Sequence, residues 1–149
     1  MLLQDRVMRG VVVGLLADAV KLTANYLAFR AGLTQVIFWQ LTSTYILPAE
    51  EIVQPLGILV GALVDITVSA SLGVLFLYVL KYTGSEYLWL KGLGYGMLTW
   101  AGLFATLLGP HIEKKVPQDA AGILVTIVAH ACFGLALAWF SKLYLERAD

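Results

Sequence analysis

Four apolar stretches, each long enough to cross a lipid bilayer as a helix, dominate this sequence of 149 residues. They cover residues 7–29, 52–80, 88–108 and 120–141, and a hydrocarbon core needs about 20 residues of helix. None of them alternates with period two, and they are too few to close a barrel, which excludes strands. Apolar residues make up 60% of the chain and charged residues 13%, which is unlike a soluble domain. The sequence predicts an all-α integral membrane four-helix bundle, with residues 1–149 as one transmembrane domain.

The charges of the loops predict an orientation in the membrane. Lysine and arginine are compared between the two sides of the bundle: Arg6, Arg9, Lys81, Lys91, Lys142 and Arg147 on one side, and Arg30, Lys114 and Lys115 on the other. The excess of basic residues is expected on the cytoplasmic side, so both termini are predicted there. The formal net charge is zero, so the composition does not indicate a basic surface that would bind nucleic acid. The expected partner is the lipid bilayer.

The first loop, residues 30–51, is longer and more mixed than the others. It interleaves aromatic residues with glutamine and threonine and ends in Pro48, Glu50 and Glu51. This composition favours an interfacial or partly re-entrant segment on the outer face of the bundle. A plain connector with aromatic anchors is the alternative. His111 is expected in another loop, at the outer surface.

Small residues recur at every fourth position of the predicted helices. Such seams let helix backbones approach closely, because association within lipid depends on packing and on hydrogen bonds between helices. The seams are therefore expected to face protein. The predicted packing glycines are Gly10, Gly14, Gly57, Gly61, Gly73, Gly92, Gly96, Gly122 and Gly134.

Each of three seams leads to an ionisable residue near the middle of its helix: Asp18, Asp65 and His130. Lys21 and then Asn25 follow Asp18 on the same helix face, and Ser69 follows Asp65 one turn later. An ionisable residue at the centre of a membrane helix costs roughly 2.5 to 3.5 kcal/mol, so these groups must be paired, protonated or hydrated. Asp65 is expected to meet Lys21 or His130 across the bundle, or to carry a proton. Together the six residues are the predicted ligand or ion pathway.

The six polar residues could have other functions. The polar groups could serve only to fix the packing of the helices. His130 alone could be a core histidine whose hydrogen bonds are made within the protein. Asp18, Asp65 and His130 could supply ligands for a metal, but no metal-binding spacing supports such a site. The sequence has no nucleophile elbow, P-loop or dinucleotide fingerprint. We therefore predict no enzymatic activity, no metal and no cofactor.

The chain also carries a faint internal duplication. The run Gly-Ile-Leu-Val at residues 57–60 recurs at 122–125, and the same offset places Asp65 opposite His130. The segments that begin at Gly10 and Gly92 both read Gly-x-x-x-Gly after a basic residue. Two helical hairpins of the same orientation would result, as in parallel-repeat transporters.

The entry to the third helix, YLWLKGLGYGMLTW, and the long first loop that ends in proline and acidic residues resemble those of small four-span membrane proteins of spore-forming, Gram-positive bacteria. The resemblance implies a bacterial cytoplasmic membrane and carries over no functional residue.

Taken together, these patterns favour a small transport or channel-type protein that handles a proton, an ion or a small polar ligand. A bundle of four helices is too thin for a wide aqueous path, so a pore would need a homo-oligomer. The alternative is a structural or accessory membrane protein whose polar centre only fixes helix packing.

Overall fold

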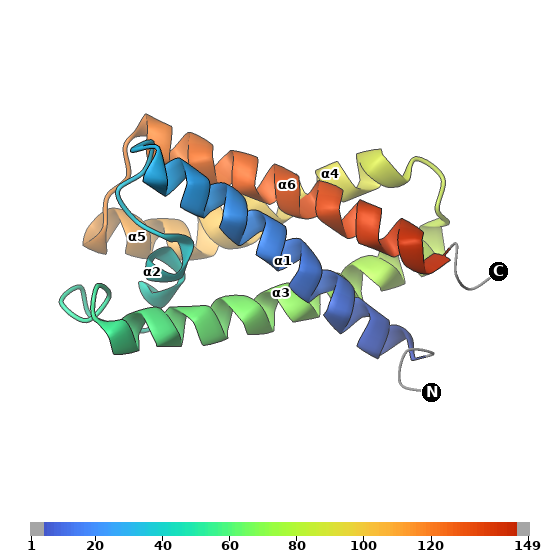
Figure 1. The fold of residues 1–149 in the computed structure, drawn as a ribbon, viewed down its shortest axis with the longest axis horizontal. Helices are drawn as coiled ribbons and strands as arrows, with labels where there is room; N and C mark the ends of the chain where they lie inside the picture. The colour runs from blue at the N-terminus through green and yellow to red at the C-terminus, as the bar shows by residue number, and fades with distance from the viewer. Residues whose placement is uncertain (1–4, 146–149) are drawn as a thin grey trace.

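The computed structural model describes residues 5–145, and within them every regular element is helical (Figure 1). The elements in chain order are α1 (Arg6–Arg30), α2 (Phe38–Ser43), α3 (Pro55–Thr83), α4 (Leu88–Thr99), the π-helical segment η2 (Trp100–Leu108), α5 (Gly109–Lys115) and α6 (Ala120–Leu145). The predicted all-α class is confirmed. The beginning of α1 and the end of α6 lie at the same end of the molecule (Figure 1).

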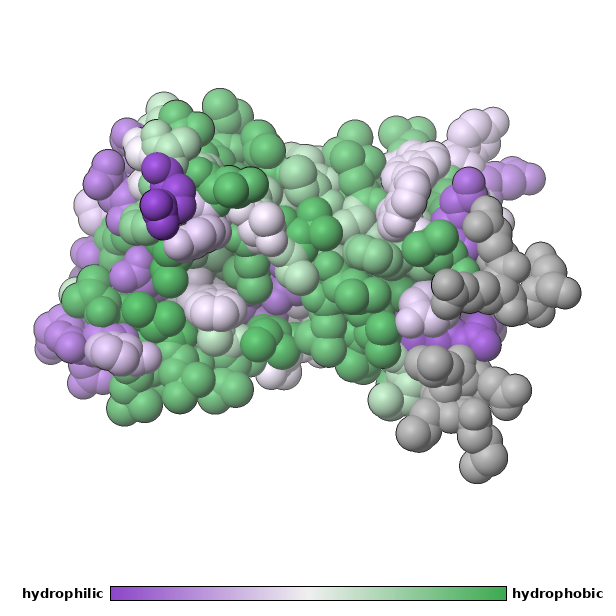
Figure 2. Space-filling view, in the orientation of Figure 1, coloured by the Kyte–Doolittle hydropathy of each residue, from purple (hydrophilic) through white to green (hydrophobic). Residues whose placement is uncertain are grey.

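Three helices of the described chain are long and apolar enough to cross a membrane: Pro55–Thr83, Leu88–Lys115 and Ala120–Tyr144. Figure 2 shows hydrophobic residues across the middle of the visible face and hydrophilic ones toward the two ends, as a bilayer requires. The chain is therefore a membrane protein with transmembrane helices. The predicted fourth span, residues 7–29, is not among the three; α1 carries five charged residues: Arg6, Arg9, Asp18, Lys21 and Arg30.

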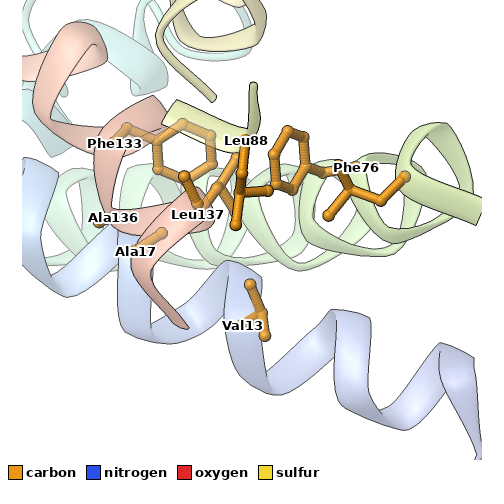
Figure 3. Close-up of a cluster of buried hydrophobic side chains, with 9 residues drawn as sticks. Val13, Ala17, Phe76, Leu88, Phe133, Ala136 and Leu137 are labelled. Atoms are coloured by element: carbon orange, nitrogen blue, oxygen red, sulfur yellow. The ribbon is translucent and has the colours of Figure 1, made fainter. Parts of the chain in front are cut away.

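α1 lies between two neighbours and packs along both α3 and α6, while α4 packs on the other side of α6. Where these helices meet, buried side chains form one hydrophobic cluster, drawn in Figure 3. Val13 and Ala17 come from α1, Phe76 from α3, and Phe133 and Leu137 from α6. The cluster joins residues far apart in the sequence, so it fixes the mutual placement of the long helices.

Two close helix crossings are made by glycines that the sequence analysis identified. At the first, between α1 and α3, a Cβ atom added to Gly14 would collide with the carbonyl oxygen of Ser69, and one added to Gly73 with that of Gly10. At the second, between α4 and α6, Gly92 and Gly134 each face the carbonyl oxygen of the other. Gly96 faces the carbonyl oxygen of His130. Backbones this close tolerate no side chain, which is the packing that small-residue seams permit.

Three predicted packing glycines have other neighbours than a long helix. A Cβ atom on Gly57 would meet the carbonyl of Glu51 in the preceding loop, and one on Gly61 would meet that of Trp39 in α2. Gly122 lies in the first turn of α6, where its N–H donates to the Asp119 carboxylate over 2.8 Å and Gln118 covers it. The nearest neighbours of Gly122 among the described residues are therefore the residues that precede its own helix.

The third predicted helix extends beyond its expected end at residue 108. It continues through η2 and α5 to Lys115, with Pro110 in the first turn of α5. His111 is therefore helical and partly buried, with its ring 5.1 Å from that of Tyr45, rather than in a surface loop. α3 likewise begins at Pro55, later than predicted.

The first loop does not rest on the outer face of the molecule. Its helix α2 packs against α3, with Phe38, Leu41, Thr42 and Ser43 buried. The Thr42 hydroxyl donates to the carbonyl of Gly61 over 2.9 Å. The segment is therefore packed into the helices, as a partly re-entrant one would be, and does not rest on their surface.

The crossing of α1 with α3 resembles the crossing of α4 with α6. The residues that correspond at the two crossings, however, differ from those that the internal duplication predicts. Gly14 meets Ser69 and Gly73, whereas Gly96 meets His130 and Gly134. Ser69 is thus the counterpart of His130 at the crossings, and the predicted pairing of Asp65 with His130 is displaced by one helical turn.

Candidate functional site

The polar centre of the molecule is built around Lys21, whose side chain reaches from α1 to α3. Its Nζ atom lies 2.7 Å from Oδ1 of Asp18 and 2.6 Å from Oδ1 of Asp65. All three side chains are almost completely buried. We call these three residues the charged triad. Burial on this scale is tolerated only because the opposite charges lie in direct contact.

Ser69 completes the contacts of the ammonium group. Lys21 donates to its hydroxyl oxygen over 3.3 Å, and the hydroxyl donates in turn to Asp18 Oδ1 over 2.9 Å. The three acceptors of Lys21 are thus Asp18, Asp65 and Ser69, which matches the three N–H groups of an ammonium. Lys21 therefore has no donor left for any further group.

One carboxylate oxygen of the triad remains without a hydrogen-bond partner. Oδ2 of Asp65 is buried and contacts no donor within residues 5–145. Two carboxylates face one ammonium, so the fully ionised triad carries a formal charge of minus one. An uncompensated buried charge is expensive. The site therefore favours a proton or another cation.

His130 lies near this centre without joining the triad. Its Nδ1 atom lies 2.8 Å from the carbonyl oxygen of Thr126 in its own helix. Its ring packs against Phe38 and Phe104, with centroid distances of 5.6 and 5.3 Å. It is 4% exposed and lines the same cavity as Lys21 and Asp65. Asp65 and His130 are thus both directed into the molecule, as the seams predict.

Asn25 is separate from the charged triad. Its Oδ1 atom accepts the backbone N–H of Phe38 over 2.7 Å, which holds the start of α2 against α1. Its Nδ2 atom has no partner among the described residues. Asn25 therefore positions Phe38, and through it the aromatic face beside Lys21.

A cavity of about 280 Å³ lies between α3, η2 and α2. Its polar lining includes Lys21, Asp65, Ser69 and His130, together with Thr42, Tyr45 and Thr99. Most of the remaining surface is apolar and comes from α3, η2 and three phenylalanines: Phe38, Phe104 and Phe133. A largely apolar pocket with a few convergent polar groups is the usual form of a small-ligand site.

The sequence alone does not single out these aromatic residues. Phe38, Phe104 and Phe133 lie on three elements with no common spacing, and only the fold brings them to one cavity. The sequence does not identify η2 either, where the side-chain hydroxyl of Thr106 donates to the carbonyl of Ala101 over 2.6 Å. Such π segments are frequent at functional sites.

No protein-family model, no curated protein and no solved structure matches the chain. Within residues 5–145, no group of three histidine, cysteine, aspartate or glutamate side chains is arranged to hold a metal ion. The function must therefore be argued from the site itself.

Proposed function

We propose that this protein is a four-span carrier or channel of a bacterial cytoplasmic membrane, and that its polar centre handles a proton, an ion or a small polar ligand. It would belong with the small four-span proteins of spore-forming bacteria that its sequence resembles, and it would act as a homo-oligomer rather than as an enzyme. α1 would supply the fourth span, since its 25 residues reach about 37 Å as a helix.

The observation that carries the proposal is Oδ2 of Asp65, which has no hydrogen-bond partner within the described part of the chain. Packing alone does not require a second carboxylate beside a single lysine, and ionisable groups inside a membrane most often mark ion or proton pathways. Asp65 also lines an accessible cavity. A carboxylate with one free oxygen, next to a space that can admit a ligand, is suited to gaining and losing a cation.

A structural function is the second candidate, and the contacts within the triad favour it. Lys21 binds both carboxylates and Ser69 directly, as a device that fixes the crossing of α1 and α3 would do. Under this alternative the charges contribute to stability and move nothing.

The two candidates predict different effects for the variant Asp65→Asn. An asparagine retains an oxygen that can accept from Lys21 but removes the titratable carboxyl group. We expect the variant to fold and to lose at least nine-tenths of the voltage-driven proton or cation flux into liposomes. Flux would be followed with an internal dye and thermal unfolding with circular dichroism, with His130→Gln as a second variant of the cavity.

Glu50→Gln supplies the matched control, because it makes the same chemical change at an exposed position and is expected to keep full flux. If wild-type protein gives no more flux than empty liposomes, the transport proposal is wrong. Loss of thermal stability in Asp65→Asn with flux unchanged would favour the structural function instead.

The proposed orientation gives a separate prediction. In a Cys132→Ser background, the variant Glu50→Cys is expected to react with an impermeant thiol reagent added outside intact cells. The reason is that the first loop is predicted to be external. The variant Ser85→Cys, in the exposed turn between α3 and α4, should react only after the cells are opened. The reverse pattern would place both termini outside.

A further inference from the structure

The cavity reaches the surface where its lining side chains are exposed. Besides Tyr45 of the first loop, these side chains are Val68 of α3 and Leu107 of η2, which are 40% and 54% exposed. Both residues belong to helices that are long and apolar enough to span the membrane, and both lie well inside those helices. An exposed apolar side chain at that depth faces lipid chains. A ligand that uses this opening must therefore be soluble in the bilayer.

The charges of the site select the sign of the ligand. Lys21 already contacts three acceptors, so it has no N–H group for an anion. The ionised triad carries one net negative charge, and Oδ2 of Asp65 lacks a partner among the described residues. A ligand with one positive charge would neutralise the site, whereas an anion would add to an uncompensated buried charge.

Three aromatic residues of the cavity lie around the charged triad: Phe38, Phe104 and Phe133. The Lys21 ammonium lies 4.3 Å from the ring centroid of Phe38 and 5.6 Å from that of Phe133. These two rings therefore already stabilise a positive charge at this place. Phe104 extends the same wall, with its ring centroid 5.6 Å from that of Phe38. Aromatic surroundings of this kind suit ammonium groups that carry hydrocarbon substituents.

The size of the cavity limits the ligand. At about 280 Å³, it lies near the lower end of the range for small-molecule pockets, which begins at roughly 300 Å³. One aromatic ring with a compact head group would fill it. A larger ligand would extend through the opening into the lipid.

We propose that the cavity binds a lipophilic organic cation with a single positive charge, an aryl-substituted ammonium, which enters laterally from the bilayer between α3 and η2. The proposal deepens the proposed function, on which it rests, by naming the class of ligand. The positive group lies beside Asp65, and the aromatic part lies among Phe38, Phe104 and Phe133.

Three probes of similar size and different charge test the proposal: phenyltrimethylammonium, its neutral analogue tert-butylbenzene and the anion benzenesulfonate. Binding to the full chain in lipid nanodiscs would be measured by saturation-transfer NMR and corrected with empty nanodiscs. We expect the ammonium to bind at least tenfold more tightly than either of the other two. Equal binding of the neutral analogue would overturn the proposal.

Two variants examine the cavity itself. Asp65→Asn should weaken binding of the ammonium at least tenfold, and Val68→Trp should block the opening. Leu63→Trp is the control, since Leu63 is an exposed residue of α3 outside the cavity lining. Unchanged ammonium binding in both Asp65→Asn and Val68→Trp would contradict the assigned site.

Flux separates this inference from the proposed function. Proton or ion flux that depends on Asp65, without ammonium binding, would overturn the inference and leave the transport proposal standing. Ammonium binding without flux of any kind would support the site and refute transport.

Discussion

Replacing Lys21 with leucine is expected to lower the free energy of unfolding by about 3 to 5 kcal/mol, which is the usual cost of removing one partner from a buried ion pair. The substitution would leave Asp18 and Asp65 facing each other without their shared cation. It would also remove the donor to Ser69. Reversible unfolding in detergent micelles, followed by circular dichroism, measures the loss.

Lys81→Leu provides the matched control, because Lys81 is an exposed lysine near the end of α3, and its loss is expected to change stability by less than about 1 kcal/mol. The triple variant Asp18→Asn, Lys21→Leu, Asp65→Asn should recover most of the lost stability, since no buried charge remains. If Lys21→Leu alone is as stable as wild type, the charged triad is not formed in the folded protein.

Gly73→Ala is expected to destabilise the protein by about 3 kcal/mol, at the upper end of the range for overpacking. An added methyl group would collide with the backbone of α1 at both Gly10 and Gly14. Backbone atoms cannot turn aside as a flexible side chain can, so α1 and α3 would have to separate. This separation would also move Lys21 away from Asp65.

The control for this prediction is Gly94→Ala. Gly94 lies in α4 with open space where its Cβ atom would be, so the change should be neutral or stabilising by up to about 1 kcal/mol through helix propensity. Comparable unfolding free energies for Gly73→Ala and Gly94→Ala would show that the crossing of α1 and α3 is not as close as described.

The all-α class and the inward direction of the polar groups could be predicted from the sequence, because both depend on periodicity within single helices. Asp18 and Asp65 follow small residues at intervals of four, and the face that admits a close neighbour is the face that is buried. The placement of Lys21 between the carboxylates follows from the same pattern, since it lies one turn after Asp18.

Other features depend on contacts that no single segment contains. The insertion of α2 rests on Asn25 and Gly61, which belong to two different helices. The π segment covers nine residues whose composition is that of any apolar helix. Gly122 matches a seam by spacing, yet its neighbours are the residues that cap its own helix. Such features require the fold to be known.

The most direct test of the functional centre is a high-resolution experimental density map of the protein in lipid nanodiscs. We expect Lys21 between Asp18 and Asp65, an opening between Val68 and Leu107, and density for water or a cation within hydrogen-bond distance of Asp65 Oδ2. A closed, dry interior with Val68 packed against Leu107, or a Lys21 side chain directed out of the bundle, would contradict an accessible polar site.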